Sequence, residues 1–179
     1  MSQAFQDWGA DASLKEVRSR LWSWMQEGHD DGFLDHALAL FRWQAVHNAP
    51  YRAFVEAMNV QPEAISALED IPFLPVEVFK SHVVKSGAWE SKHVFRSSGT
   101  TQTTSRAQHW MDDNGLPWYA QVSRLAWQVQ WDGPVAEWAW LGLLQGYIGR
   151  EDASLLTMVA DFMAQTGAGD DGRLMHDNG

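Results

Sequence analysis

The part of this sequence that is richest in reactive chemistry is a run of short hydroxyl side chains near its middle. Residues 95–105 read FRSSGTTQTTS, with seven hydroxyl side chains in the nine residues 97–105. Such side chains pack poorly in a core, and Gly99 leaves the backbone free to turn its amide groups toward an anion. Phosphate is the natural ligand of such a loop, but composition alone favours the alternative, a polar hairpin tip that binds nothing.

Neither of the two common phosphate-binding motifs is present here. The chain lacks the GxxxxGK[ST] spacing of a P-loop and the GxGxxG spacing of a dinucleotide-binding turn. The segment instead follows a short apolar stretch directly and is flanked by Arg96 and Arg106. The preceding apolar stretch and the flanking arginines favour a phosphate-binding loop over a hairpin tip that binds nothing.

The first 70 residues predict helices. Ser13 and Glu16 have capping-box spacing ahead of an apolar stripe that ends at Gly28. A second stripe runs from Phe33 to Ala45, with Asp30 and Asp31 as candidate caps, and is closed by Asn48 and Pro50. A short third helix is expected over 51–58 and a fourth from Pro62 to about Leu68.

Beyond residue 70 the pattern predicts strands alternating with helices. Two prolines, Pro72 and Pro75, predict an extended segment that leads into a short helical turn starting near Pro75. Strands are expected over 82–85, 93–97 and 107–111, with the last two paired, and helices over 114–130 and 154–166. The apolar run 136–144 predicts a strand covered on both faces. The fold class is α/β, with a helical segment at 1–70 and an α/β part at 71–179.

Composition excludes several classes of function. The 179 residues include no cysteine and carry a formal charge of −10, with a pI near 5.0. A thiolate nucleophile is therefore excluded, and the acidic balance argues against a general nucleic-acid-binding surface. Neither HExxH nor GxSxG occurs, so we expect no metal site and no serine hydrolase. We expect no membrane span, and the cytoplasm is the default location.

Three blocks of the chain resemble the LuxE-type acyl-protein synthetase family, a branch of the adenylate-forming ligases. They are FLPVEVFKSH at 73–82, VFRSSGTT at 94–101 and LLQGYIGREDASLLTMV at 143–159. The resemblance implies that a carboxylic acid, such as a fatty acid, attacks the α-phosphate of ATP, bound with Mg²⁺. The resulting acyl-adenylate then passes its acyl group to a thiol, which can belong to an acyl-accepting protein. It also implies part of an adenylate-forming-ligase-like sheet with flanking helices.

The resemblance also implies roles for particular residues. The side chains of Ser97, Ser98, Thr100 and Thr101 would donate hydrogen bonds to phosphate oxygens, and Gly99 would let the backbone come close. Arg106 would add a cation, with Lys80 or Arg96 as alternatives. Tyr147 lies where the family has residues of the substrate pocket; a hairpin-edge aromatic is the alternative interpretation.

Two hypotheses of different class follow. The first is an adenylate-forming acyl-protein synthetase, of which this chain is the amino-terminal, ATP-binding part. The second is a non-catalytic α/β interaction module derived from the same fold. Gln102 and Gly149 depart from the family pattern and favour the second hypothesis, whereas the intact SSGTT at 97–101 favours the first.

Overall fold

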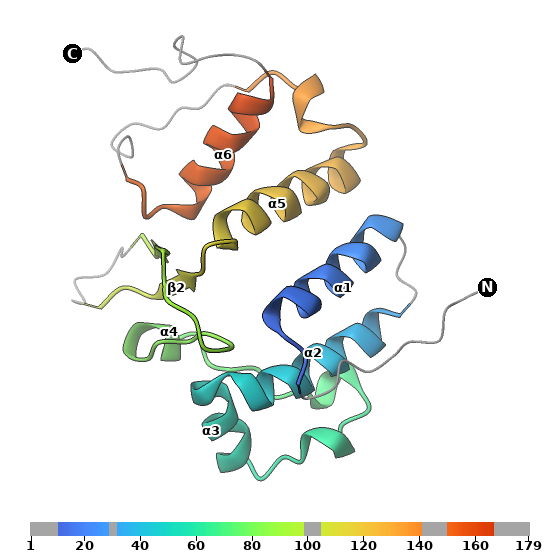
Figure 1. The fold of residues 1–179 in the computed structure, drawn as a ribbon, viewed down its shortest axis with the longest axis vertical. Helices are drawn as coiled ribbons and strands as arrows, with labels where there is room; N and C mark the ends of the chain where they lie inside the picture. The colour runs from blue at the N-terminus through green and yellow to red at the C-terminus, as the bar shows by residue number, and fades with distance from the viewer. Residues whose placement is uncertain (1–10, 29–31, 99–104, 141–149, 167–179) are drawn as a thin grey trace. The chain divides into compact units, whose positions relative to one another are not determined.

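The computed structural model describes residues 11–28, 32–98, 105–140 and 150–166. Contacts divide the chain into two compact units, Met1–Trp89 and Glu90–Gly179. The described part is mixed α/β and mostly helical, with a two-stranded antiparallel sheet (Figure 1). In this part of the chain no helix is long and apolar enough to cross a bilayer.

Helix α1, Leu14–Glu27, begins and ends as the sequence predicts. The Ser13 hydroxyl accepts a hydrogen bond from the backbone N–H of Glu16 at 3.3 Å, and the Glu16 carboxylate accepts one from the N–H of Ser13 at 2.7 Å. The bond from the Ser13 backbone lowers the pKa of Glu16 below its ordinary value. Gly28 ends the helix at a φ of 71°, where a side chain would be strained. The predicted capping box is confirmed.

Helix α2, Phe33–His47, is packed on two sides and forms the centre of the first unit. Ala39 and Trp43 pack with Val17 of α1. The other side of α2 packs against α3, which spans Ala49–Ala57, and against the segment that follows α3. The residues of α2 on this side are Leu38, Phe41 and Ala45. Gly32, rather than either predicted aspartate, occupies the N-cap position, and Asp30 and Asp31 lie outside the described residues.

Asn48 ends α2 and begins α3, as its place before Pro50 predicts. Its side-chain oxygen accepts a hydrogen bond from the N–H of Tyr51 at 3.2 Å, which caps α3. Tyr51 is buried, and its hydroxyl donates to the carbonyl of Pro72 at 2.7 Å. The turn between the two helices therefore also anchors the chain that follows them.

The chain after α3 contains shorter helical elements than the sequence predicts. Two 3₁₀ turns, Pro62–Ala64 and Leu68–Asp70, replace the expected fourth helix. The helical turn expected near Pro75 forms as α4, Val78–Ser81. The strand predicted over 82–85 is wrong: no partner strand lies beside it in the described residues, and the chain is held by other bonds.

Residues just before the division at 89/90 are tied to the first unit. The N–H of Gly87 donates to the carbonyl of His47 at 2.8 Å, and the Asn48 amide donates to the Ser86 hydroxyl at 3.2 Å. The change of sequence pattern near residue 70 therefore does not coincide with the spatial division, because 71–89 pack with the helices before them.

The second unit begins with the predicted hairpin. Strand β1, His93–Arg96, pairs antiparallel with β2, Gln108–Met111, with His93 opposite Met111 and Arg96 opposite Gln108. Phe95 is buried, and its ring meets the Tyr119 ring of the next helix at 5.2 Å. These contacts confirm the pairing expected between 93–97 and 107–111.

Two helices follow the hairpin and pack on each other (Figure 1). They are α5, Gly115–Trp131, and α6, Ser154–Gln165, close to the predicted bounds. The guanidinium of Arg124 on α5 donates to both carboxylate oxygens of Asp161 on α6, at 2.7 and 2.6 Å. This bidentate pair fixes one helix against the other.

The strand expected over 136–144 is not found in its described part. Val135–Glu137 form a 3₁₀ turn, residues 138–140 belong to no strand, and 141–144 lie outside the described residues. The indole rings of Trp138 and Trp140 meet that of Trp127 at 5.6 and 4.5 Å. The Trp140 N–H donates to the Val135 carbonyl at 3.1 Å, so aromatic packing rather than a strand ladder holds this segment.

Candidate functional site

The serine- and threonine-rich segment connects β1 to β2. Its first and last described parts are Ser97–Ser98 and Ser105–Ala107. The N–H of Ser97 donates to the carbonyl of Ala107 at 3.0 Å, and the N–H of Ala107 donates to the Ser97 hydroxyl at 3.1 Å. These two bonds close the base of the connection, so the antiparallel pair holds its two ends together.

The structure describes only some of the predicted phosphate-binding residues. Ser98 is exposed, whereas Ser97 is partly buried and its hydroxyl oxygen already accepts the bond from Ala107. Gly99, Thr100 and Thr101 lie outside the described residues, as does Tyr147 in the second predicted region. Of the predicted loop, the structure therefore describes the base of the connection.

Three arginines meet one carboxylate at this base. A guanidinium nitrogen of Arg106 lies 3.1 Å from a carboxylate oxygen of Asp152, that of Arg150 lies at 3.4 Å and that of Arg96 at 3.9 Å. Arg96 and Arg106 come from the two ends of the connection, and Asp152 precedes α6. We call these four side chains the arginine cluster. Their charges, three positive and one negative, sum to +2.

Backbone bonds hold the arginine cluster in place. Arg106 donates from Nε to the carbonyl of Ser97 at 2.6 Å and from Nη2 to that of Arg96 at 3.4 Å. The N–H of Arg96 donates to the carbonyl of Asp152 at 2.8 Å, which ties the segment before α6 to β1. The guanidinium of Arg106 is thus fixed by carbonyls as well as by the carboxylate.

The charge state of Asp152 follows from these neighbours. Partial desolvation acts to raise its pKa, but the positive charges of Arg106, Arg150 and Arg96, with a hydrogen bond from Arg150, outweigh this and lower the pKa below its ordinary value. Asp152 therefore stays ionised at neutral pH. One carboxylate cannot neutralise three guanidinium groups, so the cluster keeps a local positive charge on a chain of net charge −10.

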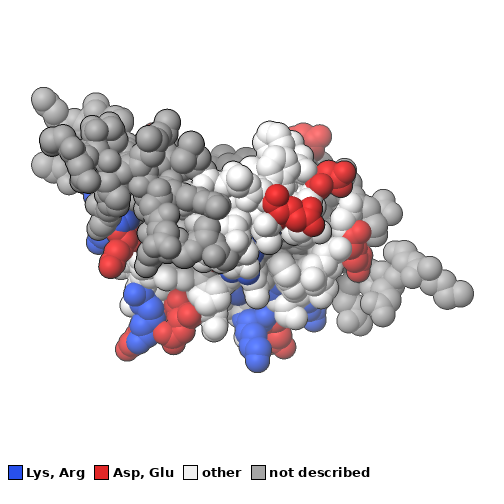
Figure 2. All heavy atoms as spheres, turned by 90° about the horizontal axis from the view of Figure 1, so that it is seen from above, with Lys and Arg blue, Asp and Glu red and all other residues white. Residues whose placement is uncertain are grey.

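One face of the molecule can be followed in Figure 2 for the distribution of charge among the described residues. In the view of Figure 2, the basic side chains of the described residues lie next to acidic ones rather than in one continuous area. On this face the described residues therefore form no continuous basic surface.

A cavity of about 340 Å³ adjoins the arginine cluster, with Arg96 and Asp152 belonging to both. Two of its lining side chains contain buried nitrogens without a hydrogen-bond partner among the described residues, Nε2 of His93 and Nε1 of Trp110. The remaining residues that line this cavity are Ser91, Lys92, Val94 and Glu151. We call it the β1 cavity.

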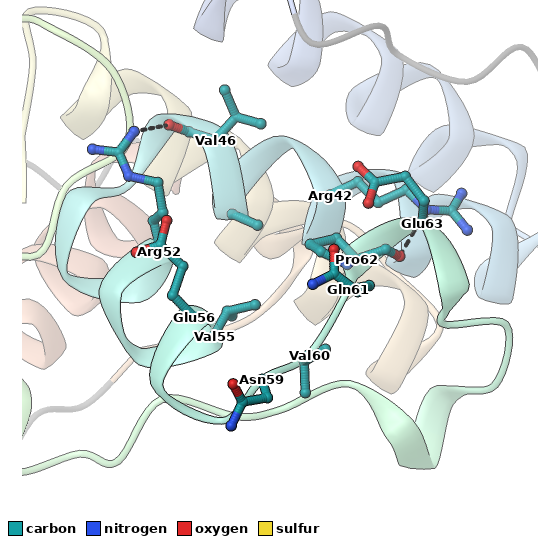
Figure 3. A pocket seen from close by; sticks show the side chains of 11 residues that line it. Arg42, Val46, Arg52, Val55, Glu56, Asn59, Val60, Gln61, Pro62 and Glu63 are labelled. Carbon is teal, nitrogen blue, oxygen red and sulfur yellow. Dashed lines mark hydrogen bonds between the residues drawn. The ribbon is translucent and has the colours of Figure 1, made fainter.

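A second cavity, of about 370 Å³, lies in the first unit between α2, α3 and the connection 59–63 (Figure 3). Its guanidinium groups are tied to backbone carbonyls: Arg42 donates to Ile65 at 3.0 Å, and Arg52 donates to Val46 at 3.2 Å. These two arginines and two glutamates, Glu56 and Glu63, line the cavity together with apolar side chains. The formal charges balance, so the cavity favours neither an anion nor a cation.

No set of three or more histidine, aspartate or glutamate side chains in the described ranges comes together to hold a metal ion. Sequence reasoning named Arg106 and Arg96 but missed Asp152 and Arg150, which lie in the segment REDAS far along the chain. A charged run before a helix has an ordinary explanation in capping, and only the fold brings it to the hairpin. Comparisons with protein-family models, with curated proteins and with solved structures find no match to this chain.

Proposed function

We propose that this chain binds the phosphates of ATP at the β1–β2 connection and serves the ATP-dependent activation of a carboxylic acid. In that reaction a carboxylate oxygen attacks the α-phosphorus, the bond to the β-phosphate oxygen breaks, and pyrophosphate leaves. A thiol then takes the acyl group and AMP is released. The proposal combines the resemblance of the three sequence blocks with the chemistry of the arginine cluster.

The observation that carries the proposal is the position of the arginine cluster. Two of its cations, Arg96 and Arg106, lie at the two ends of a connection whose sequence is rich in hydroxyl side chains. Phosphate oxygens are bound by arginine and by hydroxyl and amide donors. Catalysis of phosphoryl or adenylyl transfer depends mostly on such positioning and charge stabilisation. Mg²⁺ would arrive with the nucleotide as part of the substrate.

The direct test is binding, because it does not require the complete reaction. We expect Mg·ATP and inorganic tripolyphosphate to bind in isothermal titration calorimetry, with affinity that falls as salt is raised. Arg106→Gln should weaken both ligands by about tenfold or more, since a charge-assisted hydrogen bond contributes about 1.5–3 kcal/mol. Arg20→Gln, a charge-matched change at an exposed position on α1, should leave binding unchanged.

Two results separate the functional hypotheses. If neither ligand binds, the phosphate-binding proposal is wrong and the non-catalytic interaction module is the better hypothesis. If both bind, ATP–pyrophosphate exchange with fatty acids tests the reaction itself. We expect no exchange by this chain alone and expect exchange once it is part of a complete ligase, where Thr101→Ala should lower the rate about a hundredfold.

A further inference from the structure

The β1 cavity continues directly from the arginine cluster. Arg96 and Asp152 line the cavity and also belong to the cluster. A ligand with its anionic group at the cluster would therefore have its remaining atoms in the cavity. At about 340 Å³ the cavity lies within the range of small-molecule sites.

Two apolar side chains of the hairpin, Val94 and Trp110, belong to the lining of the cavity. Val94 and Trp110 are directly opposite each other in the β1–β2 ladder, so their side chains share one face of the hairpin. Trp110 presents an indole ring there, and its Nε1 is buried with no partner among the described residues. A planar ligand group can stack on such a ring.

The rim of the cavity carries a carboxylate that makes no interaction with the described residues. Glu151 is exposed and takes part in no hydrogen bond or ion pair with the described residues. Lys92, also at the rim, lies 3.7 Å from Glu90. A free carboxylate beside a phosphate site suits neighbouring hydroxyl groups of a ligand, which donate to it, and disfavours further negative charge.

We infer that the β1 cavity holds the nucleoside part of the nucleotide, with the base against Trp110 and the ribose hydroxyls donating to Glu151. The inference rests on the proposed function, because the phosphates must lie at the arginine cluster for the nucleoside to reach the cavity. It assigns two residues, Trp110 and Glu151, that lie outside the hydroxyl-rich connection. The site thereby selects a nucleotide over a bare polyphosphate.

The test compares ATP with tripolyphosphate, which has the same phosphate chain and no nucleoside. Calorimetry should show ATP binding at least tenfold tighter to the unmodified protein. Trp110→Ala should remove most of this preference while leaving tripolyphosphate affinity unchanged. Trp131→Ala, which removes an exposed indole from α5, serves as the matched control and should leave both affinities unchanged.

Glu151 gives a second test that does not depend on a partly buried residue. Glu151→Gln changes an exposed side chain and should not disturb folding. We expect the unmodified protein to bind ATP several-fold more tightly than 2′,3′-dideoxy-ATP, and Glu151→Gln to abolish most of that difference. The expectation holds even if Trp110→Ala fails to fold.

The outcomes distinguish this inference from the proposed function. If tripolyphosphate and ATP bind equally, or if Trp110→Ala and Glu151→Gln leave the nucleoside preference intact, the nucleoside does not occupy the β1 cavity, although phosphate binding stands. If Arg106→Gln leaves both affinities unchanged, the phosphates are not at the cluster and the proposed function fails first.

Discussion

Replacing Tyr51 by phenylalanine tests how the first unit is held together. The Tyr51 hydroxyl is buried and donates to the Pro72 carbonyl at 2.7 Å, which connects α3 to the segment after it. The change removes only the donor and leaves the carbonyl without this bond. We expect a loss of about 1–2 kcal/mol in the free energy of unfolding at neutral pH. In a unit of this size each kcal/mol lowers the melting temperature by about 4–8 °C.

The same side chain should make the first unit sensitive to high pH. Burial raises the pKa of Tyr51 to about 12 from its ordinary value of 10.0, because the folded protein favours the neutral phenol. A group with a raised folded pKa stabilises the fold fully below the unfolded pKa, and this stability is lost as pH rises from about 10 through 12. By pH 11 the loss amounts to about 1.4 kcal/mol.

Tyr51→Phe cannot ionise at this position, so its stability lacks this alkaline decline. The difference in unfolding free energy between the unmodified protein and the variant should therefore shrink from about 1–2 kcal/mol at pH 7 to nearly zero at pH 11. Guanidinium unfolding followed by circular dichroism measures it. Tyr119→Phe is the control, because that hydroxyl donates to Ser154 at 3.1 Å in an exposed setting. A difference that stays constant from pH 7 to 11 would refute the reasoning.

Three further predictions concern stability. Ser13→Ala should cost about 1 kcal/mol by removing the cap of α1, whereas Ser13→Asp should restore most of it; equal amide exchange in all three proteins would contradict the capping role. Gly115→Ala should cost about 1–3 kcal/mol, because the new Cβ would lie 2.5 Å from the Cβ of Met111; an unchanged melting temperature would disprove the crowding. Asp161→Asn and Arg124→Gln should each cost about 1 kcal/mol, and a double-mutant cycle should show coupling; additive losses would indicate no pairing.

Local signals in the sequence predicted local structure well. Ser13, Glu16 and Gly28 gave both ends of α1, because capping uses atoms only a few residues apart. Asn48 and Pro50 marked the boundary between two helices for the same reason. The antiparallel hairpin at 93–111 was also predicted, since its two β-rich stretches flank a turn-forming run.

The errors arose where distant partners decide the structure. The stretch 82–85 has strand-forming residues but finds no neighbouring strand in the described residues, and the apolar run starting at 136 packs its indoles on Trp127 instead. Hydrophobicity and β propensity indicate that a segment will be buried, but they do not identify the residues that will pack against it. The contribution of Asp152 to the candidate site was missed for the same reason.

The position of Asp152 has a consequence for the kind of anion that the site favours. Its carboxylate already occupies one place among the guanidinium groups of Arg96, Arg106 and Arg150, and its lowered pKa keeps it there at neutral pH. A single carboxylate on a ligand would have to compete with this internal one on equal terms. A phosphate chain, with several negative oxygens and two or more charges, can bind the remaining positive charge without displacing it. If the cluster binds an anion as proposed, charge alone should favour phosphates over simple carboxylates, before any contact with the rest of the ligand is made.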